Sequence, residues 1–371
     1  MIKYFSIENY YSIRKENIVE FDLNKSNDRF AAHPIIGFAG TNASGKTNFV
    51  KGLNFLLWFI GDSFFSRETK IPLEKFIGNE NLPTKFSLIF SIEENQQFEY
   101  ELEVNNNKIL SEVLSTNDEV IYTRSLKDVQ FGKMVTPFST KDLRDSSSII
   151  SYATNFDSHT FAKEIRTFFS KGGTNVDVKG HRNIEFNTSN LIELSDEIYK
   201  SKAIELAKIA DIGIVDFFVE NKESLNILHE SAFFKHKIGH SLSDFTPEQE
   251  SSGTLQFFAM LSSILPILEN GGILILDEIE IKLHQNLVAY MIGLFQNQEY
   301  NKKNAQLIFT FHNSLFMDIL QPEQLWFAEK NSSGETELFC AANFTDIKDI
   351  QTKSLEKLYR IGRFGAKPIA I

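Results

Sequence analysis

The sequence is poor in several features, and each scarcity excludes a class of protein. Its 371 residues include a single cysteine, Cys340, so no disulfide can form within the chain, and a reducing compartment is expected. No run of about 18 apolar residues occurs, so neither a membrane span nor a membrane partner is predicted. The opening MIKYFSIENYYS lacks the apolar segment of a signal peptide. These features predict a cytoplasmic protein.

An excess of basic residues is also missing. The formal net charge is -11, whereas a protein that grips a long duplex through its phosphates usually presents a basic face. The most basic stretch, residues 163–182, also contains acidic residues and is explained more simply as a solvated surface. Nucleic-acid binding stays open without being indicated. Sustained heptads are absent as well, which excludes a long coiled coil.

The first half of the chain contains alternating apolar and polar residues, together with a large share of phenylalanine. The 35 Phe residues predict a core built on aromatic packing. Alternation predicts strands near residues 2–5, 19–23, 86–92 and 98–104, the last two forming a hairpin with an acidic outer face. The run at 35–39 reads as a buried strand, and 49–60 reads as a buried helix.

The second half changes from an irregular pattern to a regular alternation. Residues 115–150 give no clear pattern. Helices are expected at 161–169, with Asp157 or Ser158 as the cap, and over a longer stretch at 191–209, followed by a strand at 212–219. A helix at 254–268, a strand at 273–276, a helix at 287–295 and a strand at 307–311 then indicate a parallel sheet.

The predicted fold class is therefore α/β, with a mixed or parallel core sheet, an antiparallel β section and a helical insert. One domain of 371 residues is expected. Within it we expect an N-terminal lobe (1–150), a mainly helical insert (151–245) and a C-terminal lobe (246–371).

The strongest motif is GTNASGKT, which matches GxxxxGK[ST] and lies between the predicted buried strand and the predicted buried helix. Backbone N–H groups of such a loop and of the helix N-terminus face a triphosphate. Lys46 is expected to reach the β- and γ-phosphates and to act in catalysis, and the Thr47 hydroxyl to ligate Mg²⁺. ATP and Mg²⁺ are thus the predicted cofactors. The expected nucleotide contacts are Gly40, Thr41, Asn42, Ala43, Ser44, Gly45, Lys46, Thr47 and Asn48.

Two carboxylates follow the apolar run ILIL at residues 273–276. Asp277 is expected to hold Mg²⁺, directly or through water, and Glu278 to act as general base toward the attacking water. An apolar strand that ends in Asp-Glu often means only that the strand has reached solvent. The presence of the phosphate-binding loop favours the functional interpretation.

Two weaker signals complete the pattern. The segment ESSGT opens an apolar helix, and a small glycine-containing helix start at Ser251 and Gly253 can approach a phosphate closely; a plain serine N-cap is the alternative. His312 follows the predicted strand at 307–311, where an imidazole could contact the γ-phosphate or the catalytic water. A hydrogen-bonded structural histidine is the alternative there.

The order of these motifs resembles the ABC-type ATPase superfamily, in particular the branch of SMC, RecF and OLD-family proteins. The opening IKYFSIENYYSIRKENIVEFDL and the segment DEIEIKLHQ are similar to that branch, although Gln285 stands where proline is usual. ESSGT, QLIFTFHNSLFMD, LWFAEKNSSGETELF and YRIGRFGAKP resemble the AAA-family ATPases of bacterial phage-defence operons, such as the RloA, AbiL and PtuA-like proteins.

This resemblance implies several roles. Ser251 and Gly253 would be the signature motif, which contacts ATP bound to the other subunit of a dimer, and His312 would be the switch histidine. Arg14 would lie near the phosphates. The segment after His312 lacks the acidic cluster of a Toprim nuclease, so an ATPase head without its own effector is expected.

The sequence leaves three functions open. The first is an ATP-hydrolysing regulatory or sensor subunit of an antiphage complex, acting as a homodimer or higher homo-oligomer that shares ATP and controls a separate nuclease or toxin. The second is a DNA-binding repair ATPase of the RecF or SMC kind. The third is an assembly scaffold that binds ATP with negligible turnover.

Overall fold

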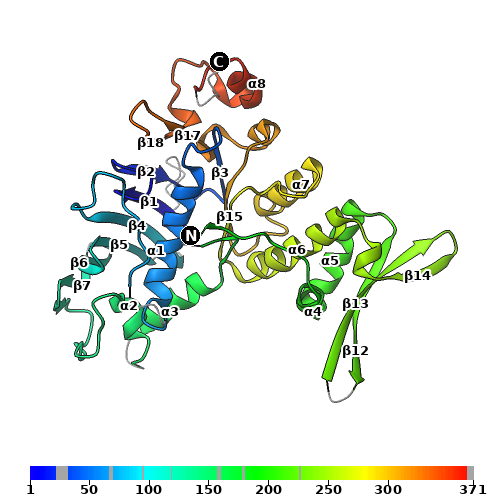
Figure 1. Cartoon of the computed structure of the whole chain (residues 1–371), viewed down its shortest axis with the longest axis horizontal. Coiled ribbons are helices and arrows are strands. Elements are labelled where there is room, and N and C mark those ends of the chain that lie inside the picture. Colours follow the sequence, from blue (N-terminus) through cyan, green and yellow to red (C-terminus); the bar gives the residue numbers. More distant parts are fainter. Residues whose placement is uncertain are drawn as a thin grey trace. The chain divides into compact units, whose positions relative to one another are not determined.

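The structure is a computed structural model that describes residues 1–21, 32–66, 70–93, 96–117, 119–156, 160–177, 180–224 and 227–365 (Figure 1). It consists of two compact units, each discontinuous in sequence. The first contains Met1–His181, Gly272–Glu278 and Asn304–Ile371, and the second contains Arg182–Gly271 and Ile279–Lys303. The three segments expected from the sequence divide the chain differently and stay a prediction.

A six-stranded sheet forms the centre of the first unit, in the order β18-β17-β3-β16-β15-β9. Strands β17, β3, β16, β15 and β9 run parallel, and β18 pairs antiparallel at the edge. Every residue of β3, β15 and β16 is buried, which explains the apolar sequence of β3 and β15 and the apolar centre Leu307–Phe309 of β16. The predicted parallel sheet is confirmed. The bounds are β3 Ile35–Ala39, β9 Gly173–Thr174, β15 Ile273–Leu276, β16 Gln306–Thr310, β17 Leu325–Lys330 and β18 Thr336–Cys340.

The second sheet of this unit is antiparallel and seven-stranded, in the order β2-β1-β4-β5-β6-β7-β8. Its strands β4 and β5 form the predicted hairpin, and Glu99 and Glu101 lie on its exposed face. Residues 94–95 of the predicted link, and Leu23 at the end of the second predicted strand, lie outside the described residues. The bounds are β1 Ile2–Glu8, β2 Asn17–Glu20, β4 Thr84–Glu93, β5 Gln96–Asn105, β6 Lys108–Thr116, β7 Glu119–Ser125 and β8 Asp128–Phe131.

Helix α1 (Lys46–Asp62) packs against both sheets. The Phe49 ring lies 5.1 Å from that of Phe5 in β1 and 5.0 Å from that of Phe38 in β3. All three side chains are fully buried. Aromatic packing therefore holds the helix that follows the phosphate-binding loop between the two sheets, as the abundance of phenylalanine predicts.

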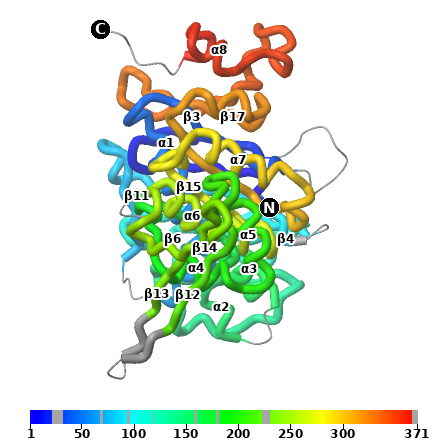
Figure 2. The backbone as a smooth tube through the Cα atoms, turned by 90° about the vertical axis from the view of Figure 1, so that its right-hand side faces the viewer, coloured from blue at the N-terminus to red at the C-terminus, as the bar shows by residue number. Residues whose placement is uncertain are grey.

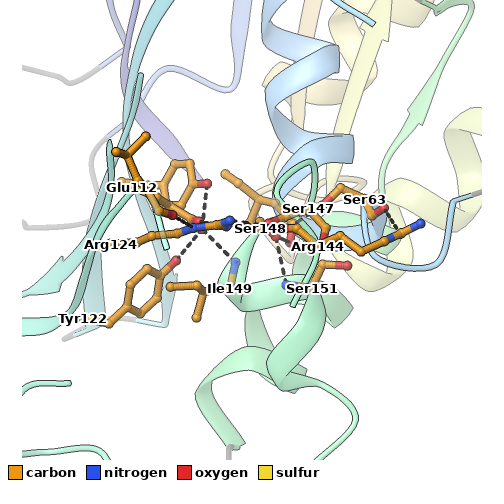
Figure 3. A network of polar contacts seen from close by, with 12 residues as sticks. Ser63, Glu112, Tyr122, Arg124, Arg144, Ser147, Ser148, Ile149 and Ser151 are labelled. Atoms are coloured by element: carbon orange, nitrogen blue, oxygen red, sulfur yellow. Dashed lines mark hydrogen bonds and ion pairs between the residues drawn. The ribbon is translucent and has the colours of Figure 1, made fainter. Parts of the chain in front are cut away.

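A buried polar network ties the antiparallel sheet to the far end of α1 (Figure 3). The Glu112 carboxylate accepts hydrogen bonds from Tyr122 and from the backbone N–H of Ile149, and it pairs with Arg124 at 3.5 Å. Arg124 also donates to the carbonyl of Ser147 at 2.8 Å. Burial raises the pKa of Glu112, and the positive charge of Arg124 opposes that rise.

The network continues toward α1 through residues on both sides of Ser147. Arg144 donates to the carbonyl of Ser63, and the Ser148 hydroxyl donates to that of Ile60 (Figure 3). The Ile60 carbonyl lies in the last turn of α1 and the Ser63 carbonyl at its C-cap, where the helix itself offers no N–H partner. The segment 115–150, which gave no clear sequence pattern, thus contains strands and the clamp on the helix end.

Short elements complete the first unit. Tyr359 of α8 stacks on Phe327 of β17 with ring centroids 5.7 Å apart, and α8 lies beside β17 in Figures 1 and 2. Asp157 and Ser158, the predicted caps of α3, lie outside the described residues. The bounds are α2 Ile149–Ala153, α3 Thr160–Ser170, β10 Val176–Asp177, β11 Gly180–His181, η2 Ser314–Ile319, η3 Pro322–Gln324, η4 Ala341–Asn343, η5 Ile350–Thr352 and α8 Leu355–Arg360.

The second unit combines helices with a three-stranded antiparallel sheet in the order β12-β13-β14. Its core contains Phe217, Phe234 and Phe258, and the Phe258 ring lies 5.4 Å from that of Phe217 and 5.0 Å from that of Phe234. The bounds are α4 Thr188–Leu194, α5 Glu197–Ala210, β12 Ile214–Ser224, β13 Ile227–Ile238, β14 Ser241–Phe245, η1 Pro247–Gln249, α6 Ser252–Asn270 and α7 Gln285–Gln296.

One predicted element of this unit is wrong and another is incomplete. The single helix expected at 191–209 is interrupted, because Asp196 leaves the helical conformation and caps α5 by accepting from the backbone N–H of Ile198. The strand expected at 212–219 is the first part of a long hairpin with β13, which the sequence pattern did not predict. Among the described helices, none is long and apolar enough to span a bilayer.

Candidate functional site

The motif GTNASGKT forms the connection between β3 and α1. Gly40 has a φ of 147° and Gly45 a φ of 104°, a region that disfavours other residues. A Cβ atom on Gly45 would lie 2.1 Å from Oγ1 of Thr336, and one on Gly40 would lie 2.3 Å from the carbonyl oxygen of Ala328. Both glycines are therefore required by close packing as well as by their backbone conformation.

Two side chains of the first turn of α1 point back toward the loop and the sheet edge. The Lys46 ammonium donates to the carbonyls of Gly40 at 2.8 Å and Thr41 at 3.0 Å. The Thr47 hydroxyl donates to both carboxylate oxygens of Asp277, at 3.1 Å and 3.0 Å. The first turn of α1 carries no acidic residue, so its positive end is available to an anion.

Asp277 lies at the carboxyl end of β15, where both its carboxylate and its backbone are hydrogen-bonded. Its carboxylate accepts from the Thr310 hydroxyl of β16 at 2.6 Å. The Asn175 amide group accepts from its backbone N–H at 2.7 Å and donates to its carbonyl at 2.8 Å. The His181 ring lies 3.8 Å from its Oδ2. Asp277 is buried, so these contacts satisfy a carboxylate that solvent barely reaches.

Glu278 and His312 lie together, and their side chains are more exposed than Asp277. His312 Nε2 lies 3.3 Å from Glu278 Oε1. The backbone of Glu278 adopts the left-handed conformation with a φ of 52°, and its N–H donates to the Thr310 hydroxyl at 2.8 Å. This conformation turns the chain at the end of β15, so Asp277 and Glu278 point to different sides. Thr310 therefore connects the two acidic residues.

A cavity of about 570 Å³ lies between the phosphate-binding loop, Glu278 and His312. Besides Lys330 of β17, its lining consists of residues predicted from the sequence: Asn42, Ala43, Ser44, Gly45, Lys46, Thr47, Asn48, Glu278 and His312. The tertiary structure thus collects the phosphate-binding loop, the predicted base and the predicted switch histidine around one space. A different cavity of the first unit, of about 660 Å³, is lined by Glu16, Glu323 and Cys340 and contains none of the predicted site residues.

Ser12 of the N-terminal turn and Thr336 of β18 hold the phosphate-binding loop through hydrogen bonds. The Ser12 hydroxyl bonds to that of Thr336 at 2.7 Å and accepts from the Asn48 amide at 2.8 Å. The Thr336 hydroxyl lies 2.8 Å from the carbonyl oxygen of Ser44. Arg14 pairs with Glu335 at 2.8 Å, so its guanidinium is engaged beside this turn.

Ser251 and Gly253 lie in the second unit, at the start of α6. The Ser251 hydroxyl caps the helix by accepting from the Thr254 backbone N–H at 3.0 Å. Ser251 and Ser252 are exposed, and the first turn of α6 carries no acidic residue. The role in binding ATP of a partner copy stays a prediction.

The residues present suit a magnesium nucleotide. The Ser44 hydroxyl is buried in the loop without a hydrogen-bond partner among the described residues, a polar atom that a phosphate oxygen would satisfy. Thr47 and Asp277 offer the hard oxygen ligands that Mg²⁺ prefers.

Three supporting residues were missed by reading the sequence. Thr310 and Asn175 hold Asp277, and Lys330 contributes a cation to the cavity. Thr310 is the last residue of the buried strand β16 and stands two residues before His312, and this position is the local signal that could have indicated it. Asn175 carried no comparable signal, because its role depends on pairing between β9 and β15.

The loop between β3 and α1 at the edge of a parallel core sheet defines a P-loop protein of the AAA class. Over residues 35–318 the chain matches the family described as "AAA domain, putative AbiEii toxin, Type IV TA system", and it belongs to that family.

A search of curated proteins found no match. Among solved structures, an Smc head bound to the C-terminal winged-helix domain of ScpA is 13% identical, with 97% of this chain and 99% of that one covered and a TM-score of 0.50. The SMC head domain of Thermotoga maritima is 15% identical, with 91% and 98% covered and a TM-score of 0.48. The similarity to the ScpA-bound Smc head supports the fold of an SMC-type head for this chain.

Proposed function

We propose that this protein binds and hydrolyses ATP at the cavity of the first unit and acts as an ATP-dependent switch. The observation that carries the proposal is the convergence of Lys46, Thr47, Asp277, Glu278 and His312 at one edge of the core sheet. The loop and Lys46 hold the phosphates, and Thr47 and Asp277 hold Mg²⁺, which supplies positive charge to the phosphates when bound.

Glu278 and His312 complete the proposed chemistry. The half-exposed Glu278 carboxylate can accept a proton from a water molecule, whereas the buried Asp277 carboxylate is held beside the loop by the hydroxyls of Thr47 and Thr310. His312, at 3.3 Å, orients that carboxylate and can donate to a γ-phosphate oxygen. The two neighbouring acids thus have different roles because their surroundings differ.

Phosphate release from the full chain with Mg²⁺ and ATP tests this step. Lys46→Ala should lower nucleotide affinity and turnover together by at least tenfold, since Lys46 contacts both the loop and the phosphates. Lys127→Ala is the matched control, because the Lys127 side chain is 81% exposed in another part of the first unit. Equal activity of both variants would refute the assignment.

The second part of the proposal is a dimer that shares ATP. The exposed N-terminus of α6 at Ser251 and Gly253 would contact the nucleotide of the partner copy. An arginine at Ser251 should abolish ATP-dependent dimerisation in sedimentation velocity, whereas Ser241→Arg, an exposed serine of β14, should not. Dimerisation of the Ser251→Arg variant at the parental level would exclude the shared site.

The resemblance to ATPases of phage-defence operons favours a regulatory or sensor subunit whose ATP-bound dimer controls a separate effector, such as a nuclease or toxin. The family assignment supports the ATPase, and the effector is the proposed addition. The genes adjacent to this one test the idea, because a nuclease or toxin gene is expected there. A repair operon would favour the second function below.

A DNA-binding ATPase of the RecF or SMC kind is the second candidate, and the SMC-head fold favours it. Its expected sign is duplex binding that requires ATP and weakens steeply with salt. The net charge of -11 opposes an extended basic surface. The third candidate, an ATP-dependent scaffold, predicts nucleotide binding without phosphate release.

A further inference from the structure

Three elements of the second unit bring an imidazole and two carboxylates together, apart from the ATP site. Asp211 caps the C-terminus of α5, His236 lies on β13, and Glu250 follows η1. Strand pairing sets this arrangement, since Ile214 of β12 is the partner of His236 and the N–H of Lys237 donates to the carbonyl of Gly213 at 2.9 Å. Residues distant in sequence therefore meet at one end of the hairpin.

His236 continues the inward face of β13. Ala232, Phe234 and His236 alternate along this strand and are all buried, so the imidazole ends an otherwise apolar row. The Phe245 ring of β14 stacks on it with centroids 4.5 Å apart. The ring is thereby held in one plane with its Nε2 facing Glu250.

The two carboxylates are also fixed. The Glu250 side chain is 3% exposed and its Oε1 lies 2.5 Å from His236 Nε2, while the His236 side chain is 8% exposed. Asp211 Oδ1 accepts from the backbone N–H of Gly213 at 2.8 Å. One ligating atom from each of the three residues lies within 4.8 Å of the other two.

This donor set has the chemistry of a transition-metal site. Two carboxylates stand beside one imidazole here, and burying carboxylates costs free energy unless hydrogen bonds or a cation compensate. An imidazole nitrogen with carboxylate oxygens suits Zn²⁺ and similar ions, whereas Mg²⁺ prefers oxygen alone. Ligand atoms around a tetrahedral Zn²⁺ are about 3.4 Å apart, so the His236–Glu250 pair at 2.5 Å must widen, and the half-buried Asp211 side chain must adjust, for all three to bind one ion.

We propose that Asp211, His236 and Glu250 bind a divalent transition-metal ion of the Zn²⁺ class. The ion replaces the hydrogen bond between His236 and Glu250, whose proton is released to solvent, and water completes its coordination. Because Glu250 directly precedes Ser251, the ion anchors the start of α6 to the β12–β13 hairpin and to the end of α5. The site would stabilise the second unit whether or not ATP is hydrolysed.

Metal titration of the full chain tests the proposal. Metal-free protein in excess MgCl₂, which occupies the oxygen ligands of the ATP site, is titrated with CoCl₂ and, separately, ZnCl₂. We expect one equivalent of Co²⁺ with visible absorption bands, displaced by Zn²⁺, and a higher unfolding temperature with Zn²⁺. His236→Gln and Asp211→Asn should each weaken binding by at least tenfold. An asparagine retains the acceptor for the Gly213 N–H, so Asp211→Asn preserves the local fold.

His240→Gln is the matched control, because His240 is exposed and lies just beyond β13. It should keep the metal and the Zn²⁺-dependent shift in unfolding temperature. Absence of stoichiometric metal in the parental chain would overturn the proposal and leave a hydrogen-bonded His–Glu pair only. Binding retained by both His236→Gln and Asp211→Asn would also overturn it. Phosphate release with Mg²⁺ and ATP is measured independently and tests the ATPase.

Discussion

Replacing Thr310 with valine removes a hydroxyl that holds both acidic residues of the site while preserving the shape of the side chain. In the parental chain this hydroxyl donates to the Asp277 carboxylate at 2.6 Å and accepts from the Glu278 N–H at 2.8 Å. Thr310 is fully buried, so water cannot replace either bond. The variant leaves a buried carboxylate with one donor fewer and a backbone N–H without its acceptor.

The magnitude follows from these two bonds. A hydrogen bond to a charged group contributes about 1.5–3 kcal/mol, and a neutral one contributes about 1 kcal/mol. Part of that loss is recovered by relaxation, so we expect unfolding to become easier by roughly 2–3 kcal/mol. Turnover should fall by about 10- to 100-fold, because a displacement of Asp277 and Glu278 by about 1 Å misplaces both the metal ligand and the base.

Urea unfolding and phosphate release measure the two effects separately. Thr310→Ser keeps the hydroxyl and loses only a methyl group, so it should retain most of the activity. The reasoning is refuted if Thr310→Val hydrolyses ATP at the parental rate, or if the serine variant is as impaired as the valine variant.

Three further predictions concern other parts of the chain. Glu278→Gln should lower turnover by about 10²- to 10⁴-fold in phosphate-release assays and should accumulate an ATP-bound dimer. If this variant hydrolyses ATP at the parental rate, Glu278 is not the general base. Arg124→Met should destabilise the fold by about 3–5 kcal/mol in urea unfolding, because it leaves Glu112 buried without a counter-charge. Lys127→Met, which removes an exposed ion pair, is the control and should cost less than about 1 kcal/mol. Burial raises the pKa of Cys340 from its ordinary value of 9.0 to about 11, so at pH 8 a thiol reagent should modify the native chain on the order of a hundred times more slowly than the unfolded chain. The same shift makes the free energy of unfolding fall as pH rises from 9.0 to about 11, since the folded state retains the proton there. A thiol that reacts equally fast in both states would contradict the shift.

Local patterns in the sequence predicted the phosphate-binding loop, the elements beside it and the β4–β5 hairpin. The motif at Gly40–Thr47, the run ILIL and the alternation at 86–104 each depend on contacts between residues close in sequence or on burial of a whole strand. Such signals survive in a single sequence, because strand and helix periods are fixed by backbone geometry. The strand before the loop, the helix after it and the parallel sheet were therefore predicted correctly.

Other features depend on pairing between distant segments and were not predictable. The interruption at Asp196 lies between two apolar stretches whose periodicity continues across it. The β13 strand mixes charged and aromatic residues, so its alternation is weak. Asn175 reaches Asp277 only because β9 pairs with β15, and Glu112 meets Arg124 only because β6 pairs with β7.

The sequence by itself determined the chemistry of the phosphate-binding loop and its place between a buried strand and a buried helix, because eight adjacent residues carry that information. The tertiary structure decided which side chains complete the site. Thr310, Lys330 and Asn175 join Asp277 and Glu278 through strand order and register, and the cluster of Asp211, His236 and Glu250 forms in the same way. Strand register brings together residues whose separation in sequence gives no sign of their contact.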